Sequence, residues 1–280
     1  MKDKNKEQQL LDNEKTRPNK ALGQNFLIND GVCEKIAAAT GANEGFGVIE
    51  IGPGLGALTK KLAARANKVV AVEIDSTIIP KLRENIKNAD NVEIINADIL
   101  KTPLEELIKE KFSGLRVTVV GNLPYYITSP IIMSLLEERL PIESIVAMVQ
   151  KEAAARLCAP SGSREGGAVT QAVRYYSEPK ILFDVSRGSF YPIPNVTSSV
   201  IRLEVLKEPS VSPRNEKFMF SLIKAAFCMR RKTAVNSISA GLSLNKEAVA
   251  AAIEKAGLSL DIRPERITLS QFCQISDELC

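Results

Sequence analysis

Four consecutive residues, Asn122-Leu123-Pro124-Tyr125, combine hydrogen-bond acceptors with an aromatic ring, as the binding of a planar base would need. They follow residues 117–120, a β-branched run typical of a buried parallel strand, and ligands of open α/β sheets bind beyond that end. Pro124 stiffens the turn, the amide and the backbone carbonyls offer acceptors, and Tyr125 offers a flat face. An exocyclic amino group on a planar base would need acceptors beside a stacking face. The alternative is a strand-end turn with a buried tyrosine.

A glycine-rich loop, E-I-G-P-G-L-G at residues 50–56, lies between a predicted strand at 47–51 and a predicted helix at 57–65. Strand, glycine loop and helix form the context of a nucleotide-type site, in which Gly52 and Gly54 let the backbone approach a ligand. The pattern fits a dinucleotide as well as S-adenosylmethionine. Glycine at a tight strand-to-helix turn is the structural alternative.

Two acidic residues end the next two predicted strands, at 69–74 and 92–97. Glu73 follows the glycine loop at close to the spacing at which an acid meets a ribose diol, and its carboxylate could accept from both hydroxyls. Asp98 could accept from an adenine amino group, although it could equally cap a helix. Neither acid separates the two classes of cofactor.

The chain contains no histidine, which removes several kinds of chemistry at once. A Ser-His-Asp triad, a histidine general base and a histidine-ligated metal are all excluded, and we predict no metal site. A hydride-transfer enzyme would need an acid/base partner for its substrate. Methyl transfer to an amino nitrogen needs only positioning and hydrogen-bond acceptors, so these residues favour methyl transfer.

The elements that must position these residues alternate between strand and helix over residues 47–157. Short links between such elements predict a doubly wound, mostly parallel α/β sheet. Residues 169–176 and 180–185 are interpreted as further sheet or flanking elements. Residues 190–196 are predicted to be irregular because they contain two prolines.

The chain is long enough for a main domain and a smaller one. We expect a mobile tail at residues 1–17, a main domain at 18–207 and a helical domain at 208–280. Seven Lys or Arg face two Glu between residues 207 and 232. This excess ends in Arg230, Arg231 and Lys232, which predicts a site for RNA phosphates, with a solvated helix face as the alternative.

The cysteines, the N-terminal residues and the lengths of the apolar runs predict where the protein is located in the cell. The five cysteines are scattered, without a C-x-x-C pair, which favours free thiols in a reducing cytosol. The first residues are polar and unlike a secretory signal, and the apolar runs are shorter than a membrane span. We therefore expect a cytoplasmic protein with no membrane partner.

Six separate motifs carry a resemblance to a known family: P-N-K-A-L-G-Q-N-F-L (18–27), E-I-G-P-G-L-G-A-L-T (50–59), V-E-I-D (72–75), A-D-I-L (97–100), G-N-L-P-Y-Y-I-T-S-P (121–130) and F-Y-P-I-P-N-V-T-S-S-V (190–200). From about Arg17 to its end, the chain resembles the small-subunit ribosomal RNA adenine N6-dimethyltransferases, the type linked to kasugamycin sensitivity. The resemblance implies a Rossmann-like class I S-adenosylmethionine-dependent methyltransferase fold with a smaller helical C-terminal domain.

The same resemblance implies roles for single residues. The cofactor contacts fall on positions matching Asn25, Leu27, Gly52, Glu73, Asp98 and Asn122. The Asn122 side chain and the Leu123 carbonyl would accept the two hydrogens of the target nitrogen, and the base would lie between Tyr125 and Phe190. A core aromatic between prolines is the alternative for Phe190. Gly166 stands where we expect an aromatic residue, which affects how that loop meets RNA.

The predicted activity is dimethylation of N6 on two adjacent adenines in a 3′-terminal hairpin of 16S rRNA, by a monomer acting on the 30S subunit or its precursor. One alternative is the related macrolide-resistance methyltransferase, which acts on the large subunit. The N-terminal motif and the basic C-terminal domain favour the small-subunit activity instead. A second alternative is a non-catalytic ribosome-assembly or transcription factor on the same fold. A nicotinamide dehydrogenase is a third.

Overall fold

The structure is a computed structural model that describes residues 18–19, 22–229 and 231–280. The expected tail at residues 1–17 and the basic residue Arg230 lie outside the described residues. The chain forms two compact units. Of the described residues, the first unit comprises those up to 154 together with 180–205, and the second comprises 155–179 together with those from 206 to 280.

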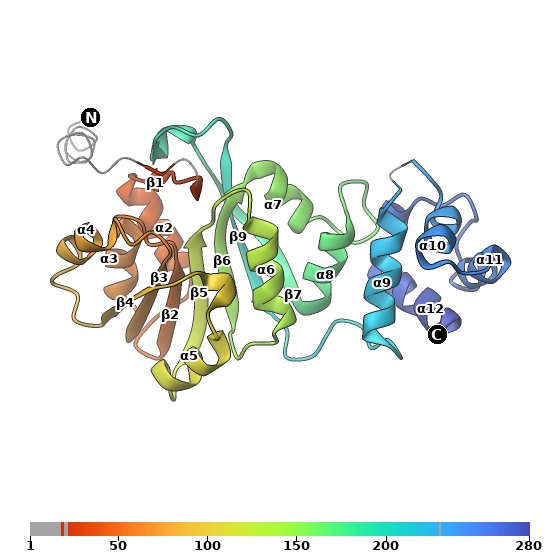
Figure 1. The fold of residues 1–280 in the computed structure, drawn as a ribbon, viewed down its shortest axis with the longest axis horizontal. Helices are drawn as coiled ribbons and strands as arrows, with labels where there is room; N and C mark the ends of the chain where they lie inside the picture. The colour runs from red at the N-terminus through yellow and green to blue at the C-terminus, as the bar shows by residue number, and fades with distance from the viewer. Residues whose placement is uncertain (1–17, 20–21, 230) are drawn as a thin grey trace. The chain divides into compact units, whose positions relative to one another are not determined.

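The first unit is built on a seven-stranded sheet with the order β4-β3-β2-β5-β6-β9-β7 (Figure 1). The strands β4, β3, β2, β5 and β6 are parallel, and β9 pairs antiparallel with β6. Their bounds are β2 Phe46–Ile51, β3 Lys68–Glu73, β4 Val92–Asn96, β5 Arg116–Asn122, β6 Ser144–Gln150, β7 Ser177–Val185 and β9 Ser198–Val205.

The parallel strands are connected by α3 Ala57–Ala63, α4 Ile79–Asn85, α5 Leu104–Lys111 and α6 Thr128–Glu137. Helix α2, Asp30–Ala39, precedes β2, and α7, Lys151–Leu157, follows β6. Strand β2 is buried at all of its residues, as expected for a strand that is covered on both faces. One buried cluster joins Ile36 of α2 and Leu62 of α3 to Val48 of β2. The predicted doubly wound sheet is confirmed, with one antiparallel addition at β9.

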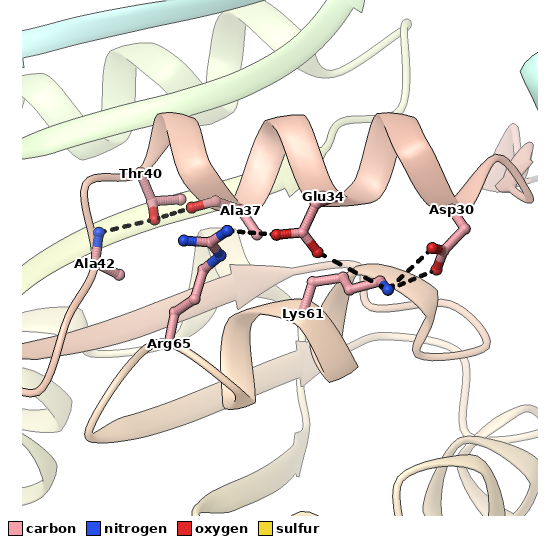
Figure 2. Close-up of polar contacts among 7 residues, drawn as sticks. All are labelled: Asp30, Glu34, Ala37, Thr40, Ala42, Lys61 and Arg65. Atoms are coloured by element: carbon pink, nitrogen blue, oxygen red, sulfur yellow. Dashed lines mark hydrogen bonds and ion pairs between the residues drawn. The ribbon is translucent and has the colours of Figure 1, made fainter.

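Helices α2 and α3 are held side by side by charges as well as by their apolar faces (Figure 2). Lys61 on α3 lies 2.8 Å from Asp30 and 3.8 Å from Glu34, both on α2. Arg65 pairs with the same Glu34. The side chain of Asn29 accepts from the Val32 N–H at 3.2 Å and caps α2, which fixes where that helix begins.

The strand order places a crevice at the C-terminal ends of β2 and β5. From β2 the chain proceeds to β3 and β4 on one side, and it then returns to place β5 and β6 on the other side. Such a switch point leaves the two neighbouring strand ends uncovered by a direct connection. The glycine loop follows β2, and Asn-Leu-Pro-Tyr begins at the last residue of β5.

A second, two-stranded sheet pairs distant parts of the sequence. Strand β1 (Phe26–Leu27) lies antiparallel to β8 (Phe190–Tyr191), with Leu27 opposite Phe190. The expectation that residues 190–196 are wholly irregular is therefore wrong for the first two. Both prolines come after the paired residues, so the N–H groups that the ladder needs are present.

The second unit is helical, with α8 Ala168–Tyr176, α9 Glu216–Phe227, α10 Ala234–Leu242, α11 Lys246–Lys255 and α12 Leu269–Leu279. Helix α8 is anchored to α9 by an aromatic cluster, in which Tyr175 and Tyr176 both contact Phe220. Both phenol groups donate to Glu216, at 2.9 and 3.1 Å. These contacts explain why residues 155–179 group with the helical unit, although the sequence analysis placed them before its boundary at 207. The role of this unit in RNA binding stays a prediction.

Among the described residues, no helix is both long enough and apolar enough to cross a membrane.

Candidate active site

A cavity of about 300 Å³ opens at the C-terminal ends of strands β2, β3, β4 and β5. Most of the residues predicted from the sequence to bind cofactor or substrate line it. They are Asn25, Leu27, Gly52, Gly54, Glu73, Asp98, Asn122, Leu123 and Tyr125. The structure thus brings together residues from five separate segments, as parallel strands ending at one edge of a sheet require.

The glycine loop forms one wall of the cavity, and its backbone adopts a conformation that favours glycine. Gly52 and Gly54 have φ values of 67° and 58°. A Cβ at Gly52 would meet no atom within 4 Å, whereas a Cβ at Gly54 would lie 3.0 Å from the Phe26 ring. The loop therefore leaves open space beside Gly52 that a ligand could occupy.

Glu73, the last residue of β3, is held by the backbone on both of its oxygens. The Gly54 N–H donates to Oε2 at 3.2 Å, and the Asp75 N–H donates to Oε1 at 2.9 Å. The residue is 3% exposed. Burial raises the pKa of Glu73, and these two backbone hydrogen bonds partly offset that rise. Its carboxylate is thus fixed in position beside the glycine loop.

Asp98 combines the two roles that the sequence left open. Its side chain accepts from the Leu100 N–H at 3.1 Å and so caps the short helix η2, Ile99–Lys101. The same residue lines the cavity. Capping engages Oδ1, and Oδ2 lies 3.8 Å from the Lys101 ammonium.

Asn122 is oriented by a segment far from it in the sequence. Its amide nitrogen donates to the Asn25 carbonyl at 2.8 Å. That contact requires the N–H group, so the amide oxygen faces elsewhere and keeps its acceptor capacity. The neighbouring Gln24 donates to Asp75 at 2.8 Å. Residues 22–28 are thereby tied to the ends of both β3 and β5.

Leu123 and Tyr125 are also held by specific contacts. The Leu123 N–H donates to the Met148 carbonyl at 3.2 Å, and its side chain is buried. The Tyr125 hydroxyl lies 2.8 Å from the Ser198 hydroxyl at the start of β9. This bond fixes the tilt of the Tyr125 ring at the cavity wall.

Phe190 is the one predicted substrate residue that the structure does not bring to the cavity surface. Its side chain is 1% exposed and belongs to the buried cluster that also contains Leu27 and Val200. Its packing is therefore that of a core aromatic. Contact with a base would require a movement of β8 or of this side chain.

Glu50, which the sequence analysis did not single out, lies at the cavity wall one residue before the end of β2. It is 1% exposed, and its Oε2 has no hydrogen-bond partner among the described residues. Burial raises the pKa of Glu50 to about 8. The Thr59 hydroxyl lowers that pKa, although its distance or angle does not make a complete hydrogen bond. The negative charge of Glu73 raises the pKa further. At neutral pH the carboxyl is mostly protonated.

Gln24 lines the cavity and donates to Asp75, a contact that sequence reasoning missed. Asp75 is 7% exposed, and burial alone would raise its pKa, but hydrogen bonds from Thr77 and Gln24 outweigh burial and lower the pKa. Asp75 and Glu50 both lie within motifs already quoted, so the signal was present. What the sequence does not show is that Gln24 meets Asp75 across the site.

Of the three residues predicted to bind RNA, two are described. Arg231 and Lys232 are exposed in the turn between α9 and α10, in the second unit. Among the residues that the structure describes, no group of three or more acidic, cysteine or histidine side chains could hold a metal ion.

Comparison of the sequence with known proteins gives matches along nearly the whole chain. The profile of the ribosomal RNA adenine dimethylase family matches residues 15–280. The chain is 46% identical over 261 residues to ribosomal RNA small subunit methyltransferase A of Alkaliphilus oremlandii, covering 93% of this chain and 91% of that protein. It is 44% identical over 264 residues to the protein of the same name from Bacillus licheniformis, with 93% and 90% covered.

Two solved structures share the fold over most of the chain. The 23S rRNA methyltransferase ErmE superposes with a TM-score of 0.71 at 28% identity, covering 91% of this chain and 99% of ErmE. A dimethyladenosine transferase from Plasmodium falciparum superposes with a TM-score of 0.72 at 25% identity, covering 89% and 95%.

Proposed function

The chain belongs to the ribosomal RNA adenine dimethylase family, and from that membership we infer that it is a methyltransferase that dimethylates adenines of small-subunit ribosomal RNA with S-adenosylmethionine. We propose more specifically that it modifies N6 of two adjacent adenines in a 3′-terminal hairpin of 16S rRNA. Its substrate would be the 30S subunit or its precursor, and it would act as a monomer in the cytoplasm.

The cavity's donor set fits S-adenosylmethionine. That cofactor presents two cationic groups, a ribose diol and an adenine amino group, all of which favour oxygen acceptors. Four acidic side chains line the cavity, namely Asp30, Glu50, Glu73 and Asp98. The orphaned oxygen of Glu50 and the open space at Gly52 support a ligand in this place. Glu73 would hold the ribose, and Asp98 the adenine.

When bound, S-adenosylmethionine supplies a methyl group with a good leaving group. The chain's own residues then need to present the nucleophile. An adenine N6 lone pair is delocalised into the ring. If Asn122 Oδ1 and the Leu123 carbonyl accept its two hydrogens, the nitrogen becomes more tetrahedral and its lone pair is aimed. No general base is required, because the proton can leave after transfer.

The target adenine must leave its stack to enter the site. Tyr125 offers one aromatic face at the cavity wall, and a stacked base is worth roughly 1–3 kcal/mol. In this proposal Phe190 supplies a second face once it is uncovered. A second methylation also requires room for one N-methyl group beside Asn122.

The single observation that carries the proposal is the meeting of Asn122, Glu73 and the glycine loop at one cavity. The structural similarity to ErmE keeps large-subunit methylation as the second candidate. The two small-subunit relatives, with 44–46% identity, favour the first.

The deciding experiment supplies the protein and S-adenosylmethionine with isolated 30S or 50S subunits and maps the modified nucleotides. We expect two adjacent dimethyladenines in 16S rRNA and no modification of 50S subunits. Modification of 50S subunits alone would favour the second candidate. Cofactor binding without methylation of either subunit would favour a non-catalytic role.

A further inference from the structure

Glu50 is a buried carboxyl group with an incomplete set of partners, at the wall of the cavity. Leaving a buried polar atom without a hydrogen bond is unfavourable, and leaving a buried charge without a partner is more so. A second buried acid, Glu73, lies on the adjacent strand β3. Two carboxylates so placed do not both ionise readily.

The hydrogen bonds decide which of the two acids holds a proton. Glu73 accepts from two backbone N–H groups, and bonds of this kind favour the charged form. No such donor reaches Oε2 of Glu50 among the described residues. The pKa of Glu50 is raised to about 8, which agrees with a proton residing on this residue at neutral pH.

We propose that Glu50 couples cofactor binding to proton release: it is protonated in the free enzyme and becomes a carboxylate when the cationic cofactor fills the cavity. The inference rests on the proposed function, since it takes the ligand to be S-adenosylmethionine. The O–H bond of the Glu50 carboxyl breaks, its electron pair stays on the carboxylate, and the proton passes to solvent. The new negative charge offsets the positive charge brought into the cavity.

Other charged groups at the cavity do not replace Glu50 in this role. The remaining ionisable residues along its wall are Asp30, Lys60, Glu73, Lys81, Asp98 and Tyr125. Asp30 pairs with Lys61, Lys81 pairs with Glu84, and Lys60 is exposed. The N–H of Asp75 donates to Glu73. Burial would raise the pKa of Asp75, but hydrogen bonds from Thr77 and Gln24 outweigh burial and lower it. Glu50 is therefore the acid best placed to release a proton near pH 7.

Titration calorimetry tests this directly, with S-adenosylmethionine added to the full chain in buffers of different ionisation enthalpy. At pH 7 we expect close to one proton to be released per cofactor, because a group with a pKa of about 8 is then about 90% protonated. From pH 6 to 7.5 the cofactor dissociation constant should fall as pH rises, approaching tenfold per pH unit. The sign follows because protons are products of binding.

Glu50→Gln keeps the size and neutral charge of the protonated carboxyl but has no proton to lose. It should bind the cofactor without the proton release of the parent, and any pH dependence that remains should be that of the cofactor's own amino group. Glu93→Gln is the matched control, because Glu93 lies on β4 and does not line the cavity. It should behave as the parent does, including any titration of the cofactor itself.

Difference infrared spectroscopy of the parent gives a second measurement that needs no variant. The carbonyl band of a protonated carboxylic acid should decrease when the cofactor is added. Parent binding without proton release, or proton release retained in a folded Glu50→Gln protein, would overturn the inference while leaving the proposed function intact. If the parent does not bind the cofactor at any pH, the proposed function itself fails, and the inference with it.

Discussion

The proposed role of Asn122 can be tested by substitution because the nitrogen and the oxygen of its amide have different surroundings. The nitrogen is engaged by the Asn25 carbonyl at 2.8 Å, and the oxygen remains to accept from a substrate. Asn122→Ala should raise the barrier of the single-turnover reaction by about 2.7–4 kcal/mol, the range for loss of one preorganised polar group. Ribosomal RNA binding should change far less, because phosphate contacts dominate it.

Asn122→Asp is the sharper version of that test. It keeps an acceptor but replaces the donor that meets Asn25, so a carboxylate oxygen would face a carbonyl oxygen. We therefore expect Asp to be nearly as slow as Ala. High activity in the Asp variant would mean that the contact with Asn25 is dispensable. A parental single-turnover rate in the Ala variant, at saturating cofactor and RNA, would remove Asn122 from the reaction.

Glu73 is expected to contribute to cofactor affinity rather than to the methyl-transfer step. A charge-assisted hydrogen bond is worth about 1.5–3 kcal/mol, so Glu73→Ala should weaken S-adenosylmethionine binding by roughly tenfold or more. Calorimetry measures this. Because Glu73 also accepts from Gly54 and Asp75, thermal unfolding must be followed in parallel to show that the variant is folded. Unchanged affinity would exclude Glu73 from the site.

At the scale of elements, the sequence predicts best those features that depend on local pattern. The strand predicted at residues 47–51 and the helix predicted at 57–65 correspond to β2 and α3, with each end within two residues of its prediction. Strands β1 and β8 were missed because each is two residues long and forms only through its distant partner. Helix α8 was ambiguous since its aromatic residues suit a strand, and its contacts with α9 make it a helix of the second unit.

In the candidate site, too, residues marked by a local sequence pattern were predicted, and those that depend on distant contacts were not. Glu73, Asp98 and Asn122 were predicted because strand ends carry ligands in this architecture, and all three line the cavity. Gln24 was not found, because its partner Asp75 is reached only through the folded path of residues 22–28. The burial of Phe190 likewise depends on tertiary packing that its flanking prolines do not reveal.

The α2–α3 ion pairs give a prediction about stability (Figure 2). Lys61 is 27% exposed and Asp30 is 72% exposed, so solvent screens their contact. Lys61→Ala should lower the free energy of unfolding by about 0.2–1 kcal/mol, and the difference should shrink at high salt. Urea denaturation at two salt concentrations measures both effects. The exposed Lys87 provides a control, since Lys87→Ala should change stability less. A salt-independent loss well above this range would show that Lys61 contributes through packing instead.

For the whole molecule, charge is divided between the two compact units. The cofactor cavity in the first unit has four acidic residues in its wall against two lysines, Lys60 and Lys81. The second unit contains all of the described residues in 207–232, with their basic excess. Within it, Lys217 and Lys224 are exposed on α9, and Arg231 and Lys232 are exposed in the turn that follows. Cofactor binding and phosphate binding should therefore respond to different substitutions.

That separation predicts the outcome of charge reversal at Arg231 and Lys232. The double variant Arg231→Glu, Lys232→Glu should bind 30S subunits more weakly. With fewer phosphate contacts, fewer counterions are released from the RNA on binding. The negative slope of log affinity against log salt should become smaller in magnitude by about 0.7–0.9 per contact. Calorimetry should give an unchanged S-adenosylmethionine affinity.

The control is Lys87→Glu, Lys109→Glu, which makes the same change of net charge at exposed positions of the first unit. If both double variants lose affinity equally, net charge alone drives association. If neither does across the salt series, Arg231 and Lys232 are an ordinary solvated surface.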